Sequence, residues 1–339
     1  MKVVIDAFGG DNAPLEIVEG VKMALKKFPE LEVVLCGKED KIKELLNNDL
    51  TRVEIVDAQD VIKNEDHPTQ AIRAKKDSSL VKAYDVLKER EDVIGLVSAG
   101  STGAVLAGAI MKIGRIKGIS RPALAPILPT KKESDVIIID SGANIDCKPI
   151  NLLHFALMGS AYYSIIYGVE SPRVALLNNG SEEGKGNELV KETFPLLQNA
   201  PINFIGNKEG GDFMSGDVDV MVADGFAGNA LLKGTEGAVK AVMSILKKSI
   251  KSHFMSKIGY LFMKQTFNEI KERVDVQGKH AGSPLLGCKK LVVKNHGGCD
   301  RNNICASIEQ TMKLHKYKLN EKIEEAIKSL GVAEEGSAE

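Results

Sequence analysis

The chain has 339 residues, of which 43% are hydrophobic and 27% charged, a composition close to the globular average that allows a substantial buried core. Lys and Arg number 45 against 46 Asp and Glu, and the net charge of −1 argues against the whole-chain basic field of a typical nucleic-acid binder. The five cysteines form no CxxC pair and no HExxH occurs, so neither a disulfide framework nor a metal site is indicated, and a reducing cytoplasm is the expected location.

The N-terminal residues are expected to form a strand rather than a secretion signal. The apolar run in MKVVIDAFGG is too short for a signal peptide, because the acidic residue Asp6 interrupts it. The longest uncharged stretch, Val93–Met111, has 19 residues, but glycines divide it into VIGLVSA, a turn and TGAVLAGAIM. We interpret it as a buried strand, a loop and a helix rather than a membrane span.

Nine apolar, β-branched runs, each followed by glycine or polar residues, are predicted to be buried strands. They lie at residues 2–7, 31–37, 52–58, 93–99, 135–142, 173–180, 202–207, 217–225 and 290–296. Their alternation with helices predicts an α/β fold, a three-layer α/β/α sandwich with a mostly parallel sheet. We expect one large domain over residues 1–330 with a helical hairpin inserted at about 240–273, and a disordered acidic tail at 331–339.

Polar, glycine-rich loops follow several of these strands, which is where ligands bind in open α/β sheets. After the first strand, Gly9 and Gly10 allow a tight turn before a helix whose first N–H groups are free to bind an anion. Comparable loops are Ser98–Gly103, Asp140–Asn144 and Asp224–Asn229. Each loop alone is ordinary turn chemistry, but their coincidence at one sheet edge predicts a group of backbone N–H donors.

The loop Asn178–Asn187 resembles a phosphate loop without matching the Walker pattern. It reads G-x3-G-K instead of G-x4-G-K, and Gly186 stands where Ser or Thr would bind Mg²⁺. No G-x-G-x-x-G opens a helix after a strand, so NTPase and nicotinamide chemistry are disfavoured and no cofactor is expected. Lys185 adds a point charge to the N–H donors, a combination suited to a small anion such as phosphate.

A basic segment lies near the C-terminal third of the chain. Residues 237–268 contain six lysines and no acid, and apolar residues at helical spacing from Val239 to Phe254 predict an amphipathic helix, with Gly259 as the expected bend beyond it. Two interpretations stay open: an element of the core or of a dimer seam, and a hairpin on a membrane surface. The absence of acids favours an anionic lipid or an acidic carrier. The membrane-contact candidates are Phe254, Lys257, Ile258, Leu261 and Phe262.

Several loops resemble signatures of the bacterial acyl-ACP:phosphate acyltransferase (PlsX) family, in order and over nearly the whole chain. The matching stretches are Phe8–Pro14, Asp66–Pro68, Arg73–Ser79, Gly142–Pro149, Glu182–Leu189 and Asp224–Asn229. The chain departs from the family at Phe8, Ser101 and Gly298-Cys299, where Met, Asn and a Ser pair are usual. At Ser101 a hydroxyl still donates a hydrogen bond.

The resemblance implies an isocitrate-dehydrogenase-like (Rossmann-like) fold and a homodimer that transfers a fatty acyl group from acyl carrier protein to inorganic phosphate, for phospholipid synthesis. Phosphate would attack the thioester directly, without an acyl-enzyme. The catalytic candidates are Lys185 for the anion, Asn229 for the oxyanion and His67 for the leaving thiol, although a histidine before proline is more often a cap. The phosphate- or substrate-binding candidates are Asp6, Gly9, Gly10, Asp11, Asn12, Ser98, Ser101, Thr102, Asn144, Asp224 and His296.

Two alternatives stay open beside this function. A short-chain phosphotransacylase using coenzyme A would differ in its chain-length preference, and a non-catalytic module that binds a carrier or a lipid surface would release no thiol when phosphate is added. The favoured expectation is a cytoplasmic enzyme associated peripherally with anionic membrane. Its product would pass to a membrane-bound glycerol-3-phosphate acyltransferase, and no nucleic-acid partner is expected.

Overall fold

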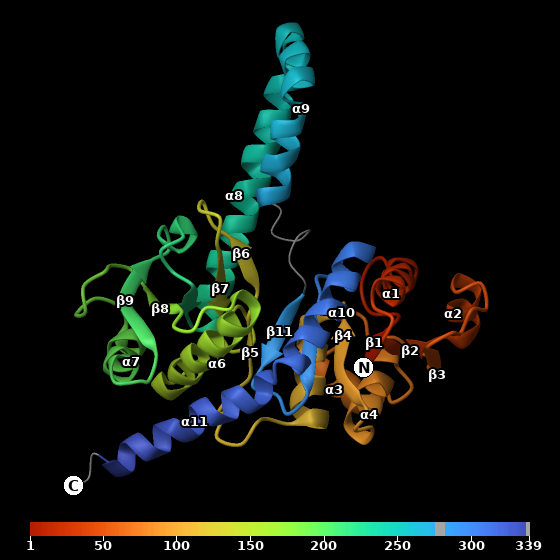
Figure 1. Cartoon of the computed structure of the whole chain (residues 1–339), viewed down its shortest axis with the longest axis horizontal. Helices are drawn as coiled ribbons and strands as arrows, with labels where there is room; N and C mark the ends of the chain where they lie inside the picture. Colours follow the sequence, from red (N-terminus) through yellow and green to blue (C-terminus); the bar gives the residue numbers. More distant parts are fainter. Residues whose placement is uncertain (275–281, 337–339) are drawn as a thin grey trace.

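The computed structural model describes residues 1–274 and 282–336, which fold into two α/β lobes with a helical hairpin projecting from between them (Figure 1). The chain builds most of the first lobe, then the second lobe and the hairpin, and returns to the first lobe at its last two strands. All nine predicted strands are present, which confirms the α/β class and the mostly parallel pairing. They are divided between two sheets rather than gathered in one.

The first lobe is built on a seven-stranded sheet with the order β3-β2-β1-β4-β12-β11-β5. Its strands are β1 (Lys2–Asp6), β2 (Glu32–Gly37), β3 (Val53–Asp57), β4 (Val93–Ser98), β5 (Ala123–Leu124), β11 (Ser283–Leu286) and β12 (Leu291–Lys294). The pairs from β3 to β12 are parallel, whereas β11 is antiparallel to both its neighbours. The helices of this lobe are α1 (Leu15–Lys27), α2 (Glu39–Leu45), α3 (Pro68–Ala74), α4 (Ser79–Glu89), α5 (Thr102–Gly108, continued by a π-helical turn at Ala109–Ile113) and α10 (Arg301–Lys316).

The second lobe is built on a five-stranded sheet with the order β6-β7-β10-β8-β9. Its strands are β6 (Ile127–Pro129), β7 (Asp135–Ile139), β8 (Arg173–Asn178), β9 (Asn203–Glu209) and β10 (Val220–Val222), all parallel except β6. The helical elements are α6 (Pro149–Tyr167), α7 (Glu188–Gln198), a 3-10 turn (Phe213–Ser215), α8 (Gly225–Ser252), α9 (Phe254–Val274) and α11 (Leu319–Gly336).

Alternate residues of each strand pack on opposite helical layers, as expected for strands buried on both faces. In β1, Val3 and Ile5 belong to the core formed with α1 and α10, whereas Val4 belongs to the core formed with α3, α4 and α5. In β7, Ile137 packs with α6, whereas Ile138 packs with Leu232 of α8 and its surroundings. Each lobe is therefore a three-layer arrangement.

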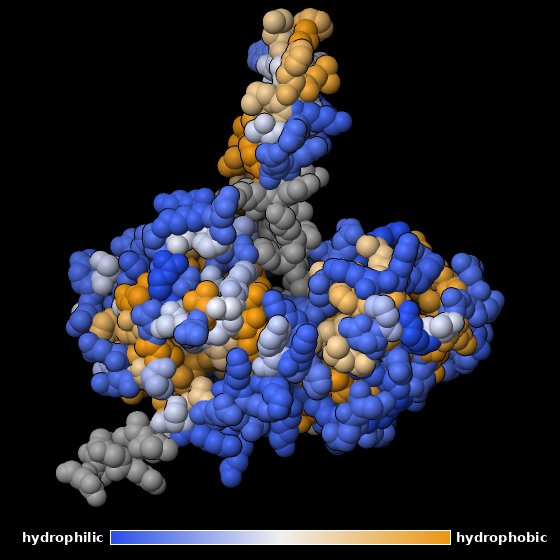
Figure 2. All heavy atoms as spheres, viewed as in Figure 1, coloured by the Kyte–Doolittle hydropathy of each residue, from blue (hydrophilic) through white to orange (hydrophobic). Residues whose placement is uncertain are grey.

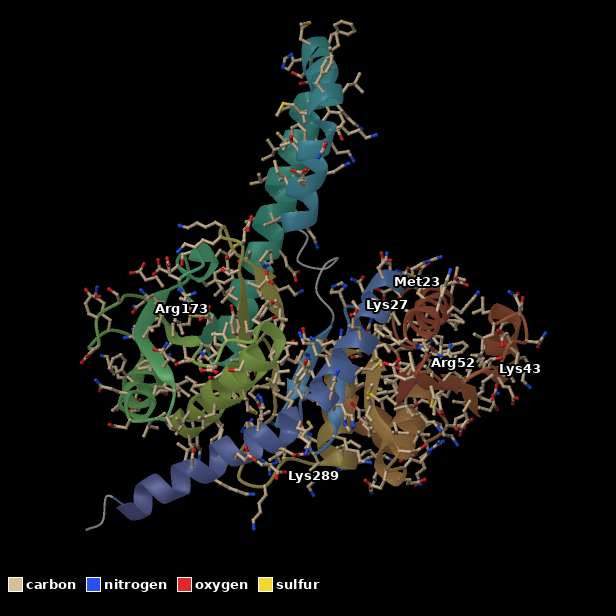
Figure 3. All side chains as sticks on the ribbon, viewed as in Figure 1. Met23, Lys27, Lys43, Arg52, Arg173 and Lys289 are labelled. Atoms are coloured by element: carbon tan, nitrogen blue, oxygen red, sulfur yellow. The ribbon has the colours of Figure 1, made fainter. Side chains whose placement is uncertain are left out.

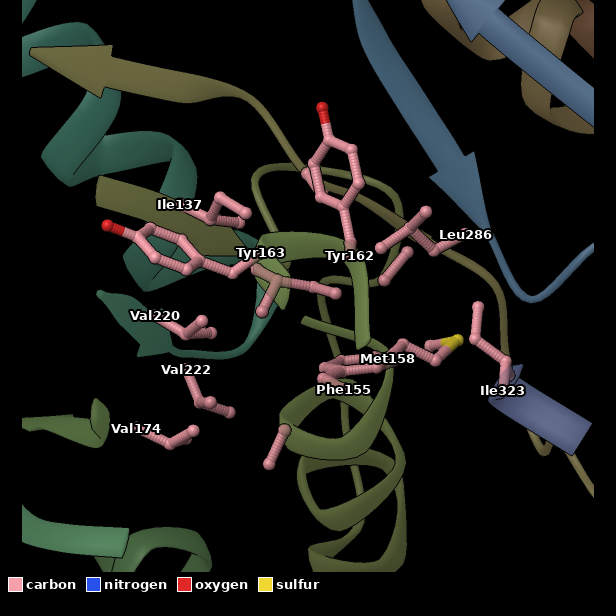
Figure 4. Packing of buried hydrophobic residues seen from close by; sticks show 14 of the residues in the cluster. Ile137, Phe155, Met158, Tyr162, Tyr163, Val174, Val220, Val222, Leu286 and Ile323 are labelled. Carbon is pink, nitrogen blue, oxygen red and sulfur yellow. The ribbon is translucent and has the colours of Figure 1, made fainter. Parts of the chain in front are cut away.

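Helix α6 is the hydrophobic centre of the second lobe. It ends at Gly168, whose φ of 70° is the left-handed conformation that stops a helix. Phe155 and Tyr162 are fully buried in the cluster that also contains strand residues of β7, β8 and β10 (Figure 4). The Tyr162 hydroxyl accepts a hydrogen bond from Gln310 of α10, which ties the second lobe to the first.

Helices α8 and α9 pack side by side as a hairpin (Figure 1). The turn between them lies at His253, in an extended conformation with φ −120° and ψ 134°. Our placement of the bend at Gly259 is wrong, because Gly259 lies inside α9. Glycine at an exposed helical position costs only about 1 kcal/mol relative to alanine, which is too little to interrupt a helix packed against a neighbour.

The end of the hairpin exposes apolar side chains. Phe254, Leu261 and Phe262 are 75%, 71% and 87% exposed, and Ile258 is 37% exposed. Figure 2 shows apolar residues gathered along the outer half of the hairpin. The side chain of Lys257 lies outside the described part of the structure. In the described ranges, none of the helices combines the length and the apolar character that crossing a membrane requires.

The C-terminal segment differs from our prediction. Helix α11 continues to Gly336, so the backbone of residues 331–336 is helical where we predicted a disordered tail from 331 onward. The alanine and glutamates of this stretch are good helix formers and extend a helix already begun at Leu319. Residues 337–339 lie outside the described residues.

Candidate active site

The glycine loop after β1 and the loop after β12 form one structure at the carboxyl edge of the first sheet. Gly10 has φ 105°, and the next amide, Asp11 N, donates to Gly297 O at 2.8 Å. Asn12 Nδ2 donates to Gly298 O and to Cys299 O at 3.2 and 3.1 Å. The predicted Gly9–Asn12 loop and the His296 loop are thus brought together, although nearly 290 residues separate them.

A buried carboxylate supports this edge from beneath. Asp6 is 1% exposed and accepts hydrogen bonds from Ser79 Oγ (2.6 Å) and Ser98 Oγ (2.7 Å). Gly100 N donates in turn to Ser98 Oγ at 3.0 Å. Desolvation raises the pKa of Asp6 above its ordinary value, and the two hydroxyls oppose that rise. Asp6 and Ser98 therefore position the loops, and their side chains are already engaged with each other.

The start of α5 brings His67 to the same edge. Ser101 precedes the helix without a capping hydrogen bond, and Thr102 is exposed in its first turn. A Cβ placed on Gly103 would lie 2.7 Å from Pro68 Cγ, so the His67-Pro68 step packs directly on this turn. His67 is exposed, and Thr69 Oγ1 lies 3.4 Å from its Nδ1.

Lys294 at the end of β12 is a candidate that the sequence did not reveal. It pairs in register with Ser98 of β4, so it lies at the centre of the carboxyl edge. Its pKa is lowered to about 8, mainly by desolvation and also by the charge of Lys233, while Cys299 and Asp11 oppose the change. Lys294 makes no ion pair with another described residue. A half-buried cation without a carboxylate partner is suited to an anionic ligand.

His296 follows two residues later and is exposed. Its Nδ1 accepts a hydrogen bond from Gly298 N at 3.2 Å, so the neutral ring carries its proton on Nε2. Desolvation lowers the pKa of His296, and the charges of Lys294 and Lys233 lower it further. At neutral pH the ring is therefore an uncharged N–H donor at the same edge.

A second buried carboxylate organises the edge of the second sheet. Asp140 is fully buried, and its Oδ1 accepts from Leu124 N (2.9 Å) and Ala143 N (3.2 Å). Its Oδ2 accepts from Asn144 N (2.7 Å) and Asn144 Nδ2 (2.9 Å). Desolvation raises the pKa of Asp140, and these N–H donors oppose the rise. The amide of Asn144 is thus buried in this network, where it positions the loop.

The first turns of α8 rest on that loop. Asp224 caps the helix, accepting from Ala227 N at 2.8 Å, and Gly225 N donates to Asn144 O at 2.7 Å. A Cβ on Gly142 would lie 3.6 Å from Asn229 Cγ, so the exposed Asn229 amide lies against the loop after β7. The predicted Asn144, Asp224 and Asn229 are therefore neighbours.

Lys185 lies in the loop between β8 and α7. Asn178 Nδ2 donates to Lys185 O at 3.0 Å, which fixes the backbone of the loop. The Lys185 ammonium is 2.9 Å from Glu182 Oε1, and its side chain is 54% exposed. Gly186 lines the same cavity as Asp224, so this loop adjoins the start of α8.

Helix α8 connects the two edges. Lys233 follows Asn229 by four residues and therefore lies on the same helical face. It makes an ion pair with Glu236 at 3.0 Å, and its charge acts on both Lys294 and His296 across the space between the lobes. Loops of both lobes thus face one helix: the loop after β12 at Lys233, and the loops after β7 and β8 at the first turns of α8.

Two arginines, Arg173 and Arg52, are bound within the fold (Figure 3). Arg173 binds Asp219 through Nη2 at 2.8 Å, and Arg52 donates to four backbone carbonyls between residues 25 and 31. In the described residues, no group of three or more His, Cys, Asp or Glu side chains is arranged to hold a metal ion.

The chain is similar to known proteins over nearly its whole length. A family model described as "Fatty acid synthesis protein" matches residues 1–322. A phosphate acyltransferase from Clostridium tetani is 46% identical over 330 residues, which cover 96% of this chain and 98% of the relative. A phosphate acyltransferase from an Exiguobacterium species is 46% identical over 328 residues, which cover 96% of this chain and 99% of the relative.

A solved structure shares the fold. The EutD phosphotransacetylase from Staphylococcus aureus aligns with a TM-score of 0.56 and 17% identity, over 93% of this chain and 94% of that chain. At this identity the likeness shows a common Rossmann-like α/β fold. The family match and the two 46%-identical relatives show more: the chain belongs to the fatty acid synthesis protein family, together with proteins named phosphate acyltransferase.

Proposed function

We propose that the protein transfers a fatty acyl group from the thioester of acyl carrier protein to inorganic phosphate and so forms acyl phosphate for phospholipid synthesis. Family membership supports acyl transfer to phosphate. The observation that carries the rest is the group of loop amides and lysines from both lobes around the first turns of α8. That arrangement fits a small anion next to a neutral electrophile.

Phosphate binds between the glycine loop, Lys294 and Lys185 in this proposal. The free N–H groups of loops and helix starts hold the anion, and the lysines reduce the repulsion that it meets near Asp11 and Asp224. The main contribution to the rate is the alignment of the attacking oxygen with the thioester, because binding has already removed the translational and rotational freedom of the phosphate.

The reaction is a direct displacement. A phosphate oxygen forms a bond to the thioester carbonyl carbon, the carbonyl oxygen becomes an oxyanion, and the C–S bond then breaks to release the carrier thiolate, which takes up a proton. Asn229 and the neighbouring N–H groups stabilise the oxyanion, a donor of this kind being worth about 2.7–4 kcal/mol. The thiol has a reference pKa of about 8.5, so its departure needs little acid. His67 and His296 are the candidates for that proton.

Thiol release tests this function. The protein is incubated with palmitoyl acyl carrier protein, and free thiol is measured with and without inorganic phosphate. We expect release only when phosphate is present, with acyl phosphate as the product. Faster transfer from acetyl coenzyme A would favour a short-chain phosphotransacylase instead, and no release from either donor would favour a non-catalytic binding module.

We predict that no cysteine forms an acyl-enzyme. Burial raises the pKa of Cys147 and Cys299 to about 11 and that of Cys288 to about 12, so none is a thiolate at neutral pH. Mass spectrometry of the protein with palmitoyl acyl carrier protein and no phosphate should show the unmodified mass. A stable palmitoyl adduct on any of these three residues would overturn direct attack.

Lys294 should give phosphate binding a distinctive pH dependence. Its pKa of about 8 means that it is charged at pH 7 and loses its proton as the pH rises through 8, so its attraction for phosphate weakens there. The KM for phosphate should rise up to about tenfold between pH 8 and 9. In Lys294→Gln the KM for phosphate should already be high at pH 7 and should not rise further between pH 8 and 9. Lys289→Gln, an exposed control before β12, should show the same rise as wild type. An identical rise in Lys294→Gln and wild type would remove Lys294 from the site.

We also propose that the protein is a homodimer that rests on the cytoplasmic face of anionic membrane through the end of the hairpin. Phe254, Leu261 and Phe262 would enter the headgroup region, and each nearby lysine adds up to about 1 kcal/mol at an anionic surface. Acyl phosphate carries a long apolar chain, and leaving it in water costs about 0.8 kcal/mol per CH₂. Release beside a bilayer therefore favours its passage to a membrane-bound glycerol-3-phosphate acyltransferase.

Sedimentation with vesicles measures this contact. Wild type should pellet with anionic vesicles, less so at high salt because the charges are screened, and binding should be lost in the Leu261→Glu/Phe262→Glu variant. The matched control is Val169→Glu/Leu196→Glu, which places the same charges at exposed apolar positions away from the hairpin. Equal pelleting with neutral vesicles, or retained binding by the hairpin variant, would show that the hairpin serves the fold or a dimer seam instead.

A further inference from the structure

A cavity of about 500 Å³ opens between the carboxyl ends of β8 and β10 and the helices α6, α7 and α8. We call it the β8–α8 pocket. Its volume falls in the range of small-molecule sites, about 300–1,000 Å³. Its walls are the apolar side chains of Leu152, Leu176, Leu177, Val190, Ala227 and Leu231.

The polar groups of the pocket do not suit an anion. Asn178, Asn179, Asn187 and Asp224 lie among the residues that line it, and no lysine or arginine does. Three of these four already serve the backbone: Asp224 accepts from Ala227 N, Asn187 caps α7 by accepting from Val190 N at 3.0 Å, and Asn178 Nδ2 donates to Lys185 O. The space is therefore suited to an uncharged apolar group.

The pocket adjoins the candidate active site. Gly186 lines it and follows Lys185 directly, while Asp224 and Ala227 line it from the turn of α8 that leads to Asn229. An apolar chain inside the pocket would thus have its polar end near the lysine and the amide that we assign to phosphate and oxyanion. Few other ligands combine a reactive polar end with a long apolar body.

We propose that the β8–α8 pocket holds the alkyl chain of the acyl donor and sets the chain length that the enzyme accepts. The proposal rests on the proposed function, and it assigns a place to the part of the substrate that does not react. Burial of each CH₂ contributes about 0.8 kcal/mol, so a pocket shortened by one methylene lowers kcat/KM up to about fourfold for a chain that filled it.

Two substitutions on α8 change the pocket in opposite directions. Ala227→Leu adds apolar volume inside it, so kcat/KM should fall more than tenfold for palmitoyl acyl carrier protein and stay unchanged for butyryl acyl carrier protein. Leu231→Ala enlarges the pocket and should shift the preference towards chains longer than palmitoyl. Ala238→Leu, at an exposed position of the same helix outside the pocket, is the matched control and should leave the preference unchanged. If Ala227→Leu lowers activity equally on both donors, or not at all, the proposal is overturned.

Binding is measured independently of transfer with a tryptophan reporter. The chain contains no tryptophan, so Asn179→Trp places a single one at an exposed position on the pocket lining. Without phosphate, palmitoyl acyl carrier protein should shift its emission to the blue, and the carrier with a free thiol should not. A shift without any phosphate-dependent thiol release would support the pocket and refute the proposed function. No shift, with normal palmitoyl transfer in the same variant, would overturn the pocket and leave the function standing.

Discussion

Replacement of Lys185 by alanine should raise the phosphate concentration needed for half-maximal activity about ten- to a hundredfold. A hydrogen bond to a charged group contributes about 1.5–3 kcal/mol, and no other lysine lies in the β8–α7 loop to replace it. Because Lys185 is half exposed and, among the described residues, forms an ion pair with Glu182 alone, the fold should not depend on it. Steady-state kinetics at varied phosphate give the KM, and thermal unfolding checks that stability is retained.

Glu182→Gln provides the matched control for Lys185. It removes the ion pair while keeping the lysine and the shape of the side chain, so the ammonium becomes freer to meet phosphate and the KM should stay equal or fall. Lys185→Arg keeps the charge and should recover part of the loss. An unchanged KM in Lys185→Ala would mean that Lys185 is only a surface partner of Glu182.

Replacement of Asp140 by alanine should produce the largest loss of stability. The substitution leaves the N–H groups of Leu124, Ala143 and Asn144, and the Asn144 side-chain amide, without an acceptor in a region closed to water. Each buried donor left unsatisfied costs about 1–3 kcal/mol, and partial relaxation makes a total of about 3–5 kcal/mol reasonable. At about 2–4 °C per kcal/mol, the melting temperature should fall by about 6–20 °C.

The same substitution should also impair activity, because Asp140 holds the loop on which Asn229 and the first turn of α8 rest. Ser141→Ala is the control. This neighbour is also buried, but its hydroxyl makes one hydrogen bond, to Leu124 O at 3.3 Å, and its removal should cost less than about 1 kcal/mol. Equal melting temperatures of Asp140→Ala and Ser141→Ala would show that the Asp140 network does not organise this edge.

The strands could be predicted from the sequence because nine of them are runs of buried, β-branched residues. The exceptions are β5, β6 and β11, which have only two to four residues and carry prolines at Pro129 and Pro284. Such short strands form where the chain crosses between larger elements and pairs with a strand there. No local sequence pattern predicts that pairing. The division into two sheets depends on long-range pairing, of β12 with β4 and of β10 with β7 and β8, which the local sequence does not show either.

The loops of the candidate site could also be predicted, but the roles of their polar side chains could not. Asp6 and Ser98 end strands and Asn144 lies after one, where ligand-binding residues are found, yet all three are buried and bonded to partners within the protein. The partners of Asp6 are 73 and 92 residues away, and spacing cannot reveal such contacts. Lys294 was missed for the opposite reason, since a lysine that ends a strand is normally solvated. The only local signal was the polar, glycine-containing stretch Asn295–Gly298 directly after it.

Helix α8 has 28 residues and therefore a length of about 42 Å. It begins at the candidate active site, close to Asn229, and ends at the apolar tip of the hairpin. One continuous helix therefore separates the site from the tip (Figure 1). That separation exceeds the diameter of a small domain, which is about 30 Å. In the proposed function, with the tip against a bilayer, the candidate active site would stand off from the lipid by enough to admit a folded carrier protein from the side, so that donor delivery and surface attachment would not compete for the same space.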